Sequence, residues 1–450
     1  MIQSPTVIAV DDRADELQTI VSTLRRLDVA CLPILAAGAK VDIKGPLRGV
    51  RLVFFDINYL PSITSEIALF EMAATILTKV IAPDNGPYVL ITWSSMADQH
   101  QKLMAHFADH VEDIPAPAIS GTLHKERFTA DGAAKDGGED LRASIAAIIS
   151  GHPQVEALMQ WETSARRAAG EVVGSLLEMF SRKDRFTGKI ADELHGTLLH
   201  VAESAVGKAN VASDRLGAVH EALVPIILDR LVHGAREDGV DDLWARAVTL
   251  KPGAPQAATG HGPSLNALSY IARPDSGPMA AGDRGVVFKL PGDVGDLMAK
   301  RAGLELQRLA ADYVENNKAG TIGPPDMKDL AARCRWVFLG VRATCDQAQG
   351  KGTMRPLVLA LEVPGDLKDS GLGLKLRRHD ARQISPVFIT SFGAAAAQQR
   401  KLLINWHWTT SMSPLELGDA EVLYRVREPL MALISSHMGG YAARPGIIEF

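Results

Sequence analysis

The chain has 450 residues, of which 46% are hydrophobic and 22% charged, and its formal net charge is −5. This composition is that of a folded globular protein and excludes a disordered or collagen-like chain. The acidic balance gives no overall positive field, which disfavours a protein that acts mainly on duplex nucleic acid. At roughly 150 residues per domain, the length predicts two or three domains.

Three cysteines, Cys31, Cys334 and Cys345, are too few and too widely spaced for a disulfide framework or a four-cysteine zinc site. The odd number and the lack of a CxxC pair favour a reducing compartment. The N-terminus has no basic segment followed by an apolar one, and no window has about 18 consecutive apolar residues. We therefore expect a cytoplasmic protein of bacterial type, with no signal peptide and no membrane span.

Short apolar runs alternate with helical periodicity over the N-terminal third of the chain. A long apolar helix is predicted at residues 67–81. Strands that alternate with helices indicate βαβ units and a parallel sheet, so the predicted fold class is α/β and doubly wound. The runs of buried-strand type are residues 6–10, 30–35, 52–55 and 88–92.

The remaining residues change in pattern twice. Residues 154–235 have helical periodicity, with Pro225 expected to kink or break one helix. Three glycines and three prolines within residues 251–264 indicate a linker. Beyond it, helices are predicted at 297–317 and 423–438. Strands are predicted between them, at 336–341, 357–363, 387–390 and 402–408.

These patterns divide the chain into four parts. The first is an α/β domain at residues 1–150. A helical domain or connector at 151–250 and a linker at 251–264 follow. A strand-rich α+β domain is predicted at 265–450.

Polar side chains follow the predicted strands of the first domain. Asp11 and Asp12 follow the first strand, Asp56 follows 52–55, Thr92 closes the next strand, and Lys125 follows the expected fifth. Ligands of doubly wound sheets bind beyond these strand ends. Converging carboxylates favour Mg²⁺, and a carboxylate beside Mg²⁺ can accept a phosphoryl group as an acyl phosphate. A hydroxyl and an ammonium group would then hold the phosphoryl oxygens.

Three segments, Val7-Ile-Ala-Val-Asp-Asp, Leu52-Val-Phe-Phe-Asp-Ile-Asn and Val89-Leu-Ile-Thr, resemble the receiver domain of two-component response regulators. The resemblance covers about 130 of the 450 residues. It implies a flavodoxin-like sheet with Asp56 as phosphoacceptor, Thr92 as switch hydroxyl and Lys125 as phosphate-binding lysine. The implied Mg²⁺ ligands are Asp11, Asp12, Asp56 and the backbone carbonyl of Asn58.

The sequence departs from this family at several positions. Pro61 stands one residue later than the family's proline, Trp93 replaces a small residue, and Glu126 rather than proline follows Lys125. The family's switch aromatic has no counterpart that the sequence identifies. A haloacid-dehalogenase phosphatase is excluded, because Asn58 stands where its second catalytic aspartate is needed.

Two segments of the C-terminal part, Arg342-Ala-Thr-Cys-Asp and Tyr424-Arg-Val-Arg-Glu-Pro-Leu, resemble a poorly characterised bacterial β-rich domain with a Cys-Asp signature. This resemblance implies no catalytic role, and we expect Cys345 to be a buried structural thiol. The strongest basic cluster is Lys375-Leu-Arg-Arg-His. We expect it to be a solvated surface, so nucleic acid is disfavoured as a partner.

The sequence therefore predicts a signalling protein of the response-regulator type, in which Mg²⁺-dependent phosphorylation of Asp56 controls an output in residues 150–450. It is not expected to be an enzyme beyond its own phosphorylation and dephosphorylation. Expected partners are a histidine kinase or kinase-like ATPase and other proteins, with a homodimer as one arrangement. The expected setting is a bacterial stress or phage-defence system. The alternative is a pseudo-receiver scaffold that docks partners without phosphorylation.

Overall fold

A computed structural model describes residues 5–26, 28–57, 65–111, 114–129, 132–249, 261–292, 298, 314–316, 333–348, 352–365, 374–376, 382–385, 388–389 and 399–442. The chain forms two compact units. One comprises Met1–Leu176 with Ile227–Lys251, and the other comprises Leu177–Ile226 with Pro252–Phe450. None of the described helices is both long and apolar enough to cross a membrane.

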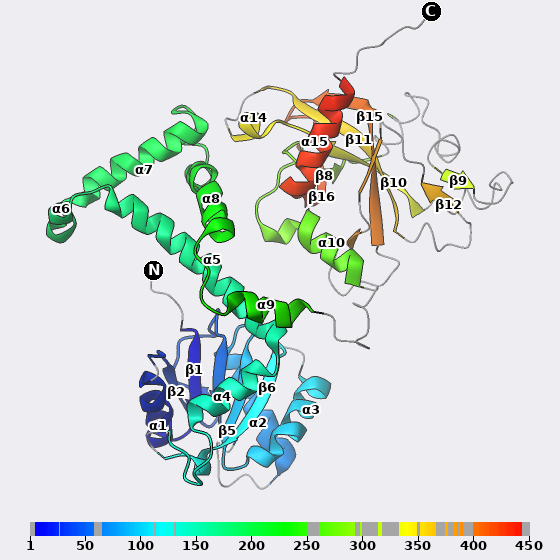
Figure 1. Cartoon of the computed structure of the whole chain (residues 1–450). Helices are drawn as coiled ribbons and strands as arrows, with labels where there is room; N and C mark the ends of the chain where they lie inside the picture. Colours follow the sequence, from blue (N-terminus) through cyan, green and yellow to red (C-terminus); the bar gives the residue numbers. More distant parts are fainter. Residues whose placement is uncertain are drawn as a thin grey trace, which may run out of the picture. The chain divides into compact units, whose positions relative to one another are not determined.

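A six-stranded sheet forms the centre of the N-terminal unit (Figure 1). Its order is β3-β2-β1-β4-β5-β6, and all neighbours are parallel except β3, which runs antiparallel to β2. Without β3 this is the strand order of flavodoxin-like folds, so the predicted α/β class is confirmed. The strands are β1 (Val7–Asp11), β2 (Leu32–Ala37), β3 (Lys40–Val41), β4 (Leu52–Phe55), β5 (Val89–Ser94) and β6 (Ile119–His124).

Helices cover both faces of this sheet because its buried strands are apolar on both sides. Side chains at alternate strand positions, such as Phe55 and Leu90, pack with α2 (Glu66–Val80) and α3 (His100–His110). The intervening positions, among them Phe54, pack on the opposite face with α1 (Ala14–Arg25) and α4 (Leu141–Ser150). The observed α2 confirms the helix predicted at residues 67–81.

A long helix, α5 (Pro153–Glu178), continues from the sheet domain and is fastened to it by an ion pair. Arg51, the residue before β4, donates to Glu162 of α5, with Nη2 2.8 Å from Oε1. Both side chains are largely buried, at 19% and 28% exposure. The helices that follow are α6 (Arg182–Thr187), α7 (Ile190–Val206), α8 (Arg215–His233) and α9 (Val240–Val248).

Two expectations for the helices need correction, and a third is narrowed. Of the kink or break expected at Pro225, the break is excluded, since α8 continues through this residue. The helix predicted at 423–438 begins only at Glu428, since residues 423–426 belong to a strand, and Pro429 lies in the first turn, where a missing N–H costs nothing. Residues 314–316 of the helix predicted at 297–317 form strand β9 (Val314–Asn316), and most of the rest lies outside the described residues.

An antiparallel sheet with strands of unequal length forms the centre of the other unit. Its order is β13-β15-β11-β10-β8-β16-β7, with β14 paired to β15. This confirms a β-rich C-terminal region. Helices α10 (Gly262–Tyr270) and α15 (Glu428–Ala442) cover one face. The strands are β7 (Ile271–Ala272), β8 (Val286–Lys289), β10 (Arg335–Gly340), β11 (Arg355–Pro364), β13 (Arg382–Ile384), β14 (Phe388–Ile389), β15 (Gln399–Met412) and β16 (Glu421–Val426), with β9 and β12 (Leu374–Leu376) pairing separately.

One buried carboxylate organises polar contacts in this second sheet. Glu362 of β11 is fully buried, forms ion pairs with Arg335 and Arg400, and accepts from the Tyr424 hydroxyl at 3.0 Å. Burial and the Glu362 charge hold the pKa of Tyr424 well above its ordinary value, so the hydroxyl stays protonated and donates. The cluster is internally satisfied, which indicates a structural role.

Gly121 in β6 lets α4 pack closely on the strand that leads to Lys125. A Cβ atom here would lie 2.9 Å from Cγ2 and 3.0 Å from Cδ1 of Ile148. Gly121→Ala should displace α4 and lower local stability by about 1–3 kcal/mol. Hydrogen exchange of β6 and α4 peptides, measured by mass spectrometry on the full chain, should accelerate. The control is Gly170→Ala on α5, where a Cβ meets nothing within 4 Å; equal exchange in both variants would contradict this packing.

Candidate functional site

Neighbouring strands β1 and β4 bring acidic residues to one edge of the N-terminal sheet. Asp11 is the last residue of β1, and Asp56 directly follows β4. The strands are parallel with Val10 opposite Phe55, so Asp11 and Asp56 occupy the next position on each. The chain turns to opposite sides of β1 to form β2 and β4, and ligands of such sheets bind at this point.

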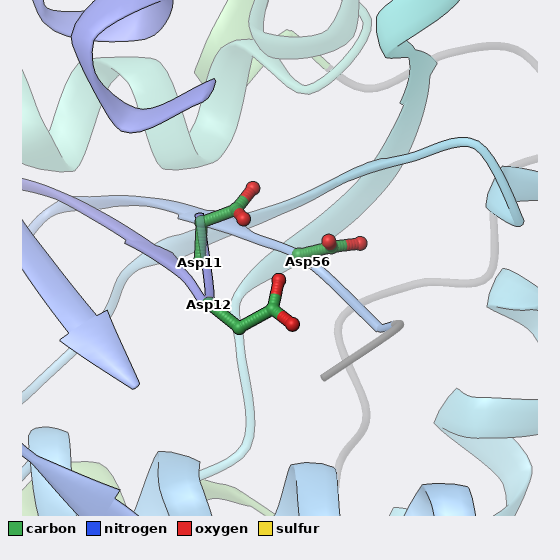
Figure 2. A group of neighbouring side chains, drawn as sticks. All are labelled: Asp11, Asp12 and Asp56. Atoms are coloured by element: carbon green, nitrogen blue, oxygen red, sulfur yellow. The ribbon is translucent and has the colours of Figure 1, made fainter. Parts of the chain in front are cut away.

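Three carboxylates, those of Asp11, Asp12 and Asp56, gather at this edge (Figure 2). One oxygen of each lies within 4.8 Å of the others. Asp11 and Asp56 are buried, at 0% and 3% exposure, and Asp12 is half-buried. Among the residues that the structure describes, no other group of His, Cys, Asp and Glu brings three ligand atoms this close. These three aspartates are therefore candidate ligands for a metal ion.

Lys125 supplies positive charge to the cluster. It begins the short helix η2 (Lys125–Arg127) after β6, and its Nζ lies 3.0 Å from Asp11 Oδ2 and 2.7 Å from Asp56 Oδ2. A third ion pair joins it to Glu16 of α1, which also pairs with the exposed Arg13 at 3.0 Å. The cluster thus has four carboxylates, those of Asp11, Asp12, Asp56 and Glu16, and two cations, Lys125 and Arg13. Arg13 is exposed to solvent.

This excess of negative charge perturbs the ionisation of the acids. Burial and the neighbouring Asp56 carboxylate raise the pKa of Asp11 to about 7, although Lys125 opposes both. The same two causes raise the pKa of Asp12. Burial would lower the pKa of Lys125, but Asp56 and Asp11 outweigh it, so the pKa is raised. Oxygen ligands with uncompensated negative charge fit a hard divalent cation.

Thr92, expected as the switch hydroxyl, lies on β5 opposite Phe55 of β4. Its side chain is fully buried, and its Oγ1 lies 2.7 Å from Nδ1 of His100 at the start of α3. The other ring nitrogen of His100 lies 3.2 Å from Oγ of Ser120 on β6. The hydroxyl of Thr92 is therefore engaged by His100, whereas Lys125 is engaged by the acids.

Trp93, which replaces a small residue of the receiver pattern, packs inside the domain. Its side chain is buried and stacks on Phe128 with a centroid distance of 5.7 Å. By register it occupies the position beside Asp56, on the face that packs with α1 and α4. Its indole Nε1 is buried without a hydrogen-bond partner among the described residues, which leaves a donor unsatisfied on this face.

Some expectations fall outside the described residues. Asn58, expected to supply a backbone ligand, and Pro61 lie in the undescribed segment 58–64. Cys345 belongs to α14 (Thr344–Ala348), but its side chain is also outside the described part. Burial raises the pKa of the other two thiols, Cys31 and Cys334, to about 12, so neither has the thiolate character of a nucleophile.

Two further residues of the site, Glu16 and His100, were not predicted from the sequence. Glu16 lies in the first turn of α1, four residues after Asp12, and its carboxylate pairs with Lys125. The helical periodicity of this segment is the one sequence signal that could have suggested this position. His100 has no such signal. Its contact with Thr92 depends on how the chain between β5 and α3 turns.

Neither a scan against protein-family models nor a search of curated proteins finds a match for this chain. The parallel sheet and the acidic cluster at its edge are compatible with a receiver-like fold.

Lys125→Met should destabilise the metal-free protein by about 3 kcal/mol at pH 8, because the clustered carboxylates lose their buried counter-charge. Added Mg²⁺ should then raise the melting temperature more than it does in the wild type, since the competing ammonium is gone. Thermal unfolding of the full chain, followed by circular dichroism with and without MgCl₂, measures both effects.

The matched control is Lys102→Met. Among the described residues Lys102 forms an ion pair with Glu66 at the surface, with side chains 60% and 47% exposed. Its removal should change neither stability nor the Mg²⁺ response appreciably. The account of the cluster is wrong if both variants melt like the wild type or respond equally to Mg²⁺.

Proposed function

We propose that this protein is a phosphorylation-dependent signalling regulator in which Asp56 accepts a phosphoryl group in the presence of Mg²⁺. The observation that carries the proposal is the convergence of Asp11, Asp12, Asp56 and Lys125 where the strand order of a flavodoxin-type sheet reverses.

Asp11, Asp12 and Asp56 are the residues that would hold Mg²⁺. When bound, the ion would neutralise charge on the acids and on the incoming phosphoryl oxygens. Phosphoryl transfer forms a bond between an Asp56 carboxylate oxygen and phosphorus, while the bond from phosphorus to the donor breaks and the donor leaves with its electron pair.

The contacts of Asp56 indicate how the carboxylate is oriented for this step. Oδ1 accepts the backbone N–H of Ile57 at 2.7 Å, and Oδ2 accepts from Lys125. The first bond fixes the plane of the carboxylate. The Lys125 ammonium, already at Asp56, is placed to pair with the phosphoryl oxygens once the group is attached.

A pseudo-receiver scaffold is the second candidate, and one specific observation favours it. Trp93 occupies the register position beside Asp56, and its buried indole stacks on Phe128. If the indole fills the space that a phosphoryl group needs, the domain would dock partners in a single state.

In the first candidate, the proposed donor is a histidine kinase or kinase-like ATPase, and residues 150–450 form the output. The proposed setting is a bacterial stress or phage-defence system in the cytoplasm. Within these residues, the second sheet and its covering helices form a folded unit that could carry the output.

Acetyl phosphate with MgCl₂ should add one phosphoryl group to the wild-type chain, as measured by intact mass spectrometry. The gain should disappear in Asp56→Asn and on treatment with hydroxylamine, which cleaves acyl phosphates. Asp84→Asn is the control, because Asp84 is an exposed carboxylate paired with Arg48 at the surface. No gain in the wild type, with acetyl phosphate and with a candidate kinase, would favour the scaffold.

A further inference from the structure

A hydrogen-bonded chain, buried at Thr92 and His100 and exposed at Ser120, links three secondary-structure elements on one face of the N-terminal sheet. His100, only 9% exposed, contacts the fully buried Thr92 through Nδ1 and Ser120 through Nε2. Thr92 belongs to β5, His100 to α3 and Ser120 to β6. One imidazole ring therefore ties the end of β5 to a helix and to the neighbouring strand.

This chain lies on the face opposite the acidic cluster. Thr92 shares its side of β5 with Leu90, which packs with α2 and α3. Asp56 continues the alternation of Phe54, which packs with α1 and α4. The hydroxyl of Thr92 is therefore drawn away from the carboxylate that would carry the phosphoryl group.

The protonation of the ring limits what the Thr92 hydroxyl can do. Burial lowers the pKa of His100, so the ring is neutral and has one donor and one acceptor nitrogen. When Nδ1 is the acceptor, the hydroxyl hydrogen of Thr92 is used and cannot be donated to a phosphoryl oxygen. Donation to phosphate then requires that this bond breaks or that the ring changes tautomer.

We propose that His100 is a positioning residue that holds the Thr92 hydroxyl away from Asp56 and thereby opposes its engagement by a bound phosphoryl group. The inference rests on the proposed function, because it concerns regulation of the same site. Loss of one neutral hydrogen bond should change the equilibrium by about two- to tenfold.

Two substitutions of His100 distinguish the hydrogen bond that its ring makes with Thr92 from the one that it makes with Ser120. The amide of Asn matches the position of Nδ1, so His100→Asn should keep the Thr92 contact and lose Ser120. The amide of Gln matches Nε2, so His100→Gln should keep Ser120 and release Thr92. Ser120→Ala removes only the second contact and serves as a control.

Binding of beryllofluoride, a phosphoryl mimic, to the full chain with Mg²⁺ is the measurement, followed by ¹⁹F NMR. We expect His100→Gln to bind about two- to tenfold more tightly than wild type, with His100→Asn and Ser120→Ala near wild type. In a Thr92→Val background, His100→Gln should have no further effect. Thermal unfolding establishes that each variant is folded.

The ring itself provides a second readout. Long-range ¹H–¹⁵N spectra report the tautomer of each histidine, and His100→Gln identifies the His100 signals by their loss. Thr92→Val should shift these signals, because Nδ1 loses its partner. Unchanged signals would overturn the inference.

The outcomes distinguish this inference from the function on which it rests. Equal beryllofluoride affinity in wild type, His100→Gln and His100→Asn would overturn the role of His100 alone. Failure of all proteins to bind beryllofluoride would overturn phosphoryl acceptance at Asp56, and with it the inference.

Discussion

Repulsion among packed carboxylates is the constraint on which the N-terminal domain depends. Asp11 and Asp56 are buried at adjacent strand ends, and the Lys125 ammonium pairs with both and opposes their charge. Burial and repulsion keep the pKa of Asp11 near 7, which shows how strongly the folded state disfavours a second buried charge. Buried, repelling carboxylates lower the stability of the folded state, whereas apolar residues at this edge of the sheet would pack without that cost in free energy. Binding chemistry is the simplest reason for it.

The parts of the site that lie at strand ends were predictable from sequence. Apolar runs followed by Asp11, Asp12 and Asp56 specify a parallel sheet with acids at one edge, because parallel strands end together. The contact between Thr92 and His100 was not predictable, since it depends on tertiary packing of α3 rather than on any local periodicity. The strand at 423–426 was mistaken for helix for a related reason: its apolar residues fit both periods, and pairing with β8 decides between them.

The second sheet follows different physical rules from the first. Its strands are mainly antiparallel, and its most buried charge, Glu362, is satisfied by arginines and a tyrosine from within the same sheet. No cluster in its described residues resembles the open, charge-unbalanced edge formed by Asp11, Asp12 and Asp56. The polar groups around Glu362 thus satisfy one another within the C-terminal sheet, whereas the acids of the N-terminal domain do not.

The ion pair between Arg51 and Glu162 has a mechanical consequence. Arg51 and Asp56 stand at opposite ends of the same short strand, β4, separated by roughly 17 Å of extended backbone. An extended strand within a sheet resists compression along its length. If the Asp56 end moved along the strand axis, the two-point contact between the Arg51 guanidinium and the Glu162 carboxylate would carry that movement to α5 without an intervening loop.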